Sequence, residues 1–166
     1  MQHRYKVGVM AKAVDVARRL IYLAESQSKT LTNMQLQKLV YIAHGLHLAF
    51  HDEELLDEEI NAWKHGPVIP DVYYEFRQYL DRNIPASEGA KGSFTDNEID
   101  TIRTAYNNFG KFNGWTLREI THKKGSPWYS IWYDGNGKET YNAVIPNETI
   151  KNHYLKIKST GKANIL

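Results

Sequence analysis

A short pattern that starts α-helices occurs three times in this chain, and it constrains the fold more than any other feature. In a capping box, a threonine hydroxyl accepts a hydrogen bond from the amide three residues later, and the Glu or Gln at that later position bonds back to the threonine amide. The pairs are Thr32 with Gln35, Thr95 with Glu98, and Thr116 with Glu119. Apolar residues flank each box as a hydrophobic staple, for example Leu31 and Leu36. We therefore expect a helical architecture with helices starting at these threonines.

Apolar residues recur at three- and four-residue intervals around these signals, as on the buried side of amphipathic helices. The pattern predicts helices over residues 10–24, 32–51, 70–80, 95–109 and 116–125, a short helix from Pro127, and a last one after Pro146. The expected core side of the second helix is Leu36, Leu39, Val40, Ala43, Leu46, His47 and Phe50. Residues 59–63 and 141–145 are typical of extended chain instead. The predicted fold class is mainly α: a compact single-domain helical bundle with at most a minor two-stranded ribbon.

The length of the chain favours one domain, because 166 residues can bury one sizeable core but hardly two. We expect residues 1–158 to form this domain and residues 159–166 to be a flexible tail. The segment 81–93 is rich in Gly, Pro, Ser and Ala, which predicts a mobile loop.

Composition excludes several classes of protein. Cysteine is absent, so disulfides, thiolate metal sites and cysteine nucleophiles are excluded together. No apolar run approaches the ~20 residues that a bilayer crossing needs, and the N-terminus lacks a secretory pattern, which predicts a cytoplasmic protein without membrane contact. The net charge of +2 gives no strong field for attracting nucleic acid, so nucleic-acid partners are not favoured.

Three motifs follow one another in the order of a known family. They are LQKLVYIAHGLHLAF at residues 36–50, EINAWKHGPVIPDVYYEF at residues 59–76, and THKKGSPW at residues 121–128. Together they resemble the Panacea family of SocA-like antitoxins, over about residues 11–154. This sequence departs from the family pattern mildly, with Val40-Tyr41-Ile42 and His44 where Leu-Tyr-Phe and Gln are usual.

The resemblance implies a function as well as a fold. It implies a helical domain with a minor strand element that neutralises a cognate protein toxin by direct binding, with no cofactor and no catalytic residue. The resemblance also permits a second role as a proteolytic adaptor, so delivery of a toxin to a ClpXP-type protease stays open as an alternative.

The candidate partner-binding residues lie on the second helix and on the turn that follows it. Lys38 and Tyr41 are three residues apart, off the main apolar stripe, which predicts a side that faces a partner rather than the core. The predicted partner-binding residues are Lys38, Tyr41, His44, Trp63, Lys64 and His65. The residues predicted to be structural are Gly66, Pro67, His122, Pro127 and Trp128.

Two alternatives belong to other classes of protein. His44, His47 and His51 share a side of the second helix, so a metal-dependent hydrolase follows in principle, although no HExxH glutamate is present and we predict no metal. The other alternative is a phage or mobile-element regulator that binds DNA, which the near-neutral charge disfavours.

Overall fold

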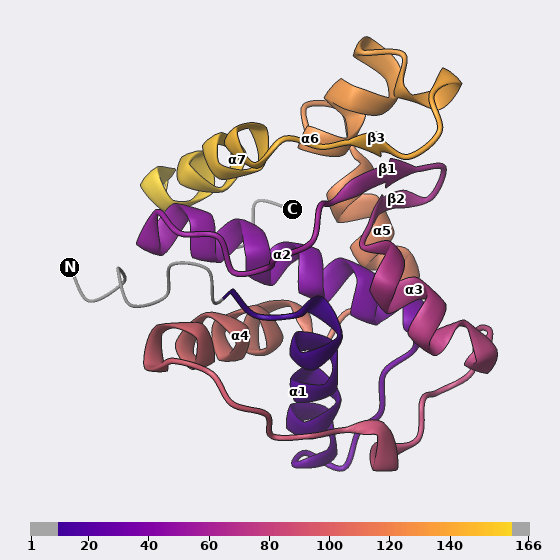
Figure 1. Ribbon diagram of the computed structural model, residues 1–166, viewed down its shortest axis with the longest axis vertical. Helices are drawn as coiled ribbons and strands as arrows, with labels where there is room; N and C mark the ends of the chain where they lie inside the picture. Colours follow the sequence, from indigo (N-terminus) through magenta and orange to yellow (C-terminus); the bar gives the residue numbers. More distant parts are fainter. Residues whose placement is uncertain (1–9, 161–166) are drawn as a thin grey trace.

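A computed structural model describes residues 10–160 and shows a mainly helical fold with one small sheet (Figure 1). In chain order the elements are α1 (Ala13–Glu25), α2 (Asn33–His51), β1 (Asn61–Trp63), β2 (Gly66–Val68), α3 (Pro70–Phe76), α4 (Asp96–Phe109), α5 (Gly114–His122), α6 (Pro127–Tyr129), β3 (Ala143–Val144) and α7 (Asn147–Thr160). Single turns of 3₁₀-helix lie at Arg77–Tyr79, Ala86–Glu88 and Gly137–Glu139, and a π-turn spans Ser130–Asp134. The predicted fold class is confirmed.

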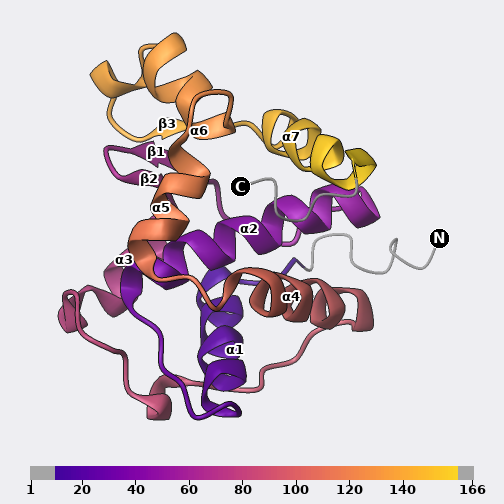
Figure 2. The same cartoon turned by 180° about the vertical axis from the view of Figure 1, so that it is seen from behind.

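Helix α2 is the centre of the molecule. It contacts α1, α3, α4, α5 and α7, and both views show these helices around it (Figures 1 and 2). Because neighbours cover α2 on nearly every side, its buried residues do not form one stripe. The prediction of a single core side was therefore too narrow. It also placed Phe50 in the core, whereas that ring is 39% exposed at the end of the helix.

Two of the three predicted helix starts are confirmed. The Thr32 hydroxyl accepts from the Gln35 amide at 3.3 Å, and the Thr32 amide donates to Gln35 Oε1 at 2.8 Å. Thr95 and Glu98 form the same pair of bonds. The third start is wrong: α5 begins at Gly114, and Asn113 Oδ1 accepts from the Thr116 amide at 2.8 Å. Asparagine ranks above threonine as a helix cap, and Asn113 comes first in the chain.

The sheet is antiparallel and has the strand order β2-β1-β3. Ala62 faces Pro67 in β2 and Ala143 in β3. The pairing of the two predicted extended segments is confirmed, but the prediction missed β2, which we had interpreted as a turn. Gly66 and Pro67 are poor strand formers, and an edge strand tolerates a proline because its amide side need not pair.

The segment between α3 and α4 is irregular, as expected, but it is held against the body of the protein. The Ile84 side chain is buried and its amide donates to the Leu31 carbonyl at 2.8 Å. Arg18 pairs with Glu88, and Arg19 donates to the Lys91 carbonyl. These contacts disagree with a freely mobile loop.

The ends of the predicted domain fit the observed elements only in part. Helix α7 continues to Thr160, so the predicted tail does not begin at residue 159, and residues 161–166 lie outside the described part of the chain. Within residues 10–160, none of the helices combines the length and the apolar character that a membrane crossing requires.

Candidate protein-binding site

The first and second family motifs meet at the β1–β2 hairpin. Lys38 Nζ donates to the Pro67 carbonyl at 3.0 Å, and Gln37 Oε1 accepts from the Ile69 amide at 3.1 Å. Gly66 has a φ of 115°, a backbone angle that residues with a side chain rarely adopt. A Cβ at this position would lie 3.0 Å from Lys38 Nζ. These contacts therefore fix β2, the second strand of the hairpin, against helix α2.

The third motif holds the same hairpin from the other side. Trp128 Nε1 donates to the Trp63 carbonyl at 2.6 Å. The His122 ring stacks on Trp128 with 3.6 Å between the ring centres, and His122 Nε2 lies 3.3 Å from the Lys64 carbonyl. Pro127 follows the Ser126 cap and opens α6. The first and third motifs thus fix the hairpin that the second motif forms.

Three of the predicted partner-binding residues are not at the surface. The exposed fraction is 2% for Lys38, 1% for Tyr41 and 0% for His44. The prediction that Lys38 and Tyr41 face outward is wrong because the hairpin covers Lys38, while Tyr154 of α7 packs edge-on against Tyr41 at 6.1 Å between ring centres. None of the three can touch a partner while these elements stay in place.

The buried Lys38 ammonium has an unusual environment. Burial, with the nearby Arg118 guanidinium, lowers the pKa of Lys38 to about 7. Its role in the fold is to donate to a buried carbonyl of the hairpin.

The hairpin displays the other three predicted residues beside an open pocket. Trp63 is half-buried, with Nε1 donating to Asn142 Oδ1 at 2.8 Å, while Lys64 and His65 are exposed. The hollow next to them, which we call the hairpin pocket, has a volume of about 570 Å³. The structure therefore brings Trp63, Lys64 and His65 together and separates them from Lys38, Tyr41 and His44.

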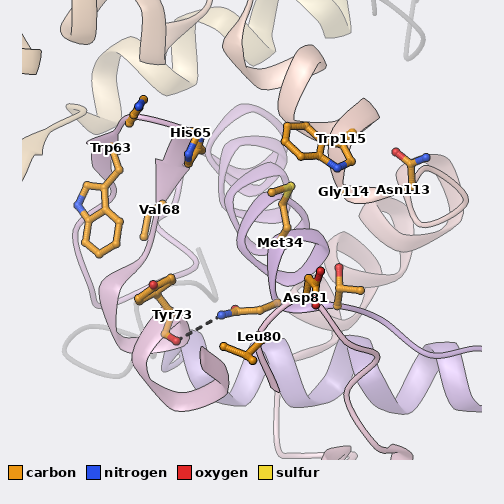
Figure 3. A pocket seen from close by; sticks show the side chains of 13 residues that line it. Met34, Trp63, His65, Val68, Tyr73, Leu80, Asp81, Asn113, Gly114 and Trp115 are labelled. Carbon is orange, nitrogen blue, oxygen red and sulfur yellow. Dashed lines mark hydrogen bonds between the residues drawn. The ribbon is translucent and has the colours of Figure 1, made fainter. Parts of the chain in front are cut away.

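The hairpin pocket is built from several elements (Figure 3). Trp63, Val68 and Tyr73 lie on one side, and Trp115 lies opposite, at the start of α5. Met34, from the first turn of α2, lies between them. Leu80 and Asp81 complete the rim. The apolar walls are open to solvent, since the exposed fraction is 63% for Trp115 and 71% for Leu80.

Basic groups lie near the hairpin and Trp115, on two sides of this pocket. The Arg118 guanidinium lies 5.5 Å from the centre of the Trp115 ring. Burial, and then the charges of Arg118, Lys64 and Lys38, lower the pKa of His65. Burial, and then Arg118, Lys38 and His65, lower the pKa of His122, against a hydrogen bond to the Lys64 carbonyl that raises it. The local field is positive.

Aromatic side chains continue past Trp63. Its ring makes edge contacts with Tyr73 and Tyr74, and the Arg77 guanidinium lies 5.0 Å from the centre of the Tyr74 ring. A second hollow of about 530 Å³ lies beyond, between Trp63 and Tyr141. We use the name hairpin surface for the side chains Trp63, Lys64, His65, Tyr74 and Trp115.

Sequence reasoning missed Met34, Tyr73, Tyr74, Leu80 and Trp115 as surface residues of this site. A signal was present for Trp115, because Asn113-Gly114 is a strong helix start that places the tryptophan in an exposed first turn. No pattern in the sequence predicts that residues of α3 and α5 line the same pocket.

Two of the three histidines of α2, His44 and His47, are hydrogen-bonded to other parts of the protein. His44 Nδ1 accepts from the Leu56 amide at 3.3 Å and Nε2 contacts Asn147 Oδ1 at 2.8 Å, while burial lowers the His44 pKa to about 4. His47 Nδ1 contacts Thr101 Oγ1 at 2.8 Å. Within residues 10–160, no group of three or more His, Cys, Asp or Glu side chains is placed to hold a metal ion. The geometry gives the hydrolase alternative no support.

These features define a mainly helical domain in which the first and third motifs hold the hairpin of the second, which carries the half-buried Trp63 and the exposed Lys64 and His65. The family model described as "Antitoxin SocA-like, Panacea domain" matches residues 36–129, more than half of the chain and all three motifs, so this chain belongs to the Panacea family of SocA-like antitoxins. Antitoxin SocA of Caulobacter vibrioides (strain NA1000 / CB15N) is 29% identical over 124 residues, which cover 68% of this chain and 66% of that protein. No solved structure matches the chain.

Proposed function

We propose that this protein is an antitoxin that neutralises a cognate protein toxin by direct binding at the hairpin surface, without a cofactor and without a chemical step. One observation supports the location: in a member of an antitoxin family, the first and third motifs hold the hairpin of the second, whose Trp63, Lys64 and His65 stand beside an open apolar pocket.

The composition of the hairpin surface supports this role. Tryptophan, tyrosine and arginine are enriched among the residues that dominate protein interfaces, and they act best beside a concave, apolar centre. Trp115 and Tyr74 are exposed although they are large and aromatic. Occlusion of a toxin by this surface needs only complementary shape and charge.

A rescue assay in cells tests the proposal. A product of a neighbouring gene that is lethal when expressed alone is expressed with the wild-type protein or with Trp115→Ala or Lys64→Ala, after each variant is shown to be folded. Truncating an anchor at an interface centre costs about 2 kcal/mol or more, roughly a thirtyfold loss of affinity, so both variants should lose protection.

Matched controls lie on other elements. Tyr22→Ala on α1 removes an exposed aromatic ring, and Arg103→Ala on α4 removes an exposed cation. Both should protect as well as the wild type. If the two hairpin variants also protect fully, the interface lies elsewhere.

The adaptor alternative has one observation in its favour. An apolar groove of about 230 Å³ lies between α2, α4 and α7, lined by Leu46, Phe50, Phe109 and Ile157, apart from the hairpin surface. An adaptor needs two surfaces, one for the toxin and one for a ClpXP-type protease. Toxin lifetime in cells separates the two functions: occlusion leaves it unchanged or longer, whereas delivery shortens it.

A further inference from the structure

We infer that the hairpin pocket receives an acidic segment of the protein partner, with one aromatic side chain seated between Trp63 and Trp115 and carboxylates against Lys64, His65 and Arg118. This inference rests on the proposed function and specifies the chemistry of the toxin's contact.

The pocket has the shape of a socket for one large apolar side chain. Its volume of about 570 Å³ lies in the range of pockets that bury small ligands. Apolar surface comes from Trp63 and Val68 on one side, from Trp115 opposite them, and from Met34 in between (Figure 3). Two indole walls favour an aromatic occupant, because offset and edge-on ring contacts add to the burial of apolar area.

The charges around the socket favour an anionic neighbour. Lys64 and His65 stand at the tip of the hairpin, and Arg118 lies behind Trp115. In its ammonium form, which dominates below about pH 7, Lys38 adds positive charge from beneath the hairpin. Asp81 is the one acidic side chain among the residues that line the pocket. Carboxylates of a partner would neutralise cations that mainly repel one another in the free protein.

Two further features favour binding of an acidic partner at the hairpin pocket. The first residues of α2 and α5 line the pocket, so the positive ends of both helix dipoles lie beside it. The hairpin is also fixed before binding by Lys38 and Trp128, which lowers the entropy that a partner must overcome.

A protein segment fits this site better than a nucleic acid. A single strand of RNA or DNA needs a basic groove that follows its backbone over several nucleotides. This pocket is short, has Asp81 on its rim, and belongs to a chain whose net charge is only +2. Nucleic-acid binding is therefore an outcome that would contradict the inference.

Binding of an acidic segment at this site should depend on pH. Burial, and then the neighbouring charges of Arg118 and Lys38, lower the pKa of His65 and His122 in the free protein. Carboxylates placed beside them raise those pKa values, so binding takes up protons. Affinity should then be higher at about pH 6 than at about pH 8, because histidine titrates in this window.

The experiment uses the full chain and labelled synthetic peptides. The probe carries one tryptophan flanked by glutamates, and its controls replace the glutamates with glutamine, replace them with lysine, or replace the tryptophan with alanine. The acidic tryptophan peptide should bind at least about tenfold more tightly than each control. Lys64→Glu and Trp115→Ala should each weaken it by a similar factor, whereas Lys64→Arg and the remote Arg103→Glu should not.

Several results would overturn the inference. They are no binding of the acidic peptide, equal binding of the glutamine or lysine peptide, no effect of Lys64→Glu, an affinity that does not rise between about pH 8 and pH 6, or displacement by single-stranded RNA of equal length. The rescue assay separates this failure from that of the proposed function. Toxin that is neutralised through Trp115 while the acidic peptide fails to bind leaves the function standing and removes only the acidic segment.

Discussion

At the scale of single residues, Lys38 shows how far tertiary contacts can change the role of a side chain. A lysine in an amphipathic helix is normally solvated, yet here its aliphatic chain crosses the core and its Nζ reaches the Pro67 carbonyl. A buried carbonyl without a donor costs about 1–3 kcal/mol, so the bond offsets part of the cost of burying an amine. Burial lowers the Lys38 pKa to about 7, which means that the neutral amine dominates above that pH.

The pH dependence of stability tests this environment. Above about pH 7 Lys38 is neutral in the folded protein but protonated in the unfolded chain, where its pKa is about 10.4. The unfolded chain then binds more protons, so the free energy of unfolding rises with pH in this window. Relative to Lys38→Met, the wild type should gain about 3 kcal/mol between pH 7 and pH 9.5. Urea denaturation at both pH values measures this gain, and parallel curves for the two proteins would contradict it.

At the scale of elements, the start of α5 shows a conflict between two local signals. Thr116 and Glu119 match the capping box, but Asn113 lies three residues earlier and takes the Thr116 amide as its own partner. The same type of pattern is confirmed at Thr32 and Thr95, where the residue three positions earlier is Lys29 or Gly92 rather than an asparagine. A short-range motif therefore predicts a helix start only when neighbouring residues do not compete for it.

Substitutions at the two candidate caps distinguish these signals. Asn113→Ala should lower the free energy of unfolding by about 1 kcal/mol, because it removes the side-chain acceptor for the first turn of α5. Thr116→Ala should have little effect, since Thr116 lies inside the helix, where alanine is favoured. Thermal or urea denaturation measures both changes. A larger loss for Thr116→Ala than for Asn113→Ala would restore the original prediction.

The contact between α2 and α7 depends on a glycine. A Cβ built at Gly45 would lie 2.3 Å from Cδ2 of the Tyr154 ring, so the two helices approach more closely than any side chain allows. Gly45→Ala gains helix propensity but forces Tyr154 or α7 to move. Overpacking of this kind costs about 1–3 kcal/mol. We expect a lower denaturation midpoint for Gly45→Ala, and an unchanged or higher midpoint would show that α7 adjusts freely.

At the scale of the whole molecule, the sequence predicted elements better than it predicted their surroundings. Helix positions and the pairing of β1 with β3 follow from periodicity and turn residues, which are local. The exposure of side chains on α2 does not follow from local patterns, because it depends on five other helices and a hairpin from distant parts of the chain. For this reason Tyr41, which was predicted to face outward, lies in the core, while the aromatic Trp63 is half-buried beside the hairpin pocket.

The hairpin joins these distant parts, and this makes the stability of the molecule non-additive. Lys38 holds the hairpin at the Pro67 carbonyl, and Trp128 holds it at the Trp63 carbonyl. When one donor is removed, the other hydrogen bond still holds the hairpin. The remaining bond then stabilises a looser hairpin and contributes less to the free energy of unfolding. The double variant Lys38→Met with Trp128→Phe should therefore cost less than the sum of its single variants. Side chains that share a structural element typically show coupling energies of about 0.5–3 kcal/mol.

A double-mutant cycle by urea denaturation measures this coupling. All four proteins are compared at one pH near 9, where Lys38 is neutral in the folded wild type, so that its titration does not enter the difference. The control cycle pairs Trp128→Phe with Thr95→Ala, which removes the cap of α4 and shares no hydrogen bond with the hairpin. Distant, independent sites add within about 0.3–0.5 kcal/mol, so the control should be additive. Additivity in both cycles would mean that Lys38 and Trp128 stabilise the fold independently and that the hairpin does not connect them.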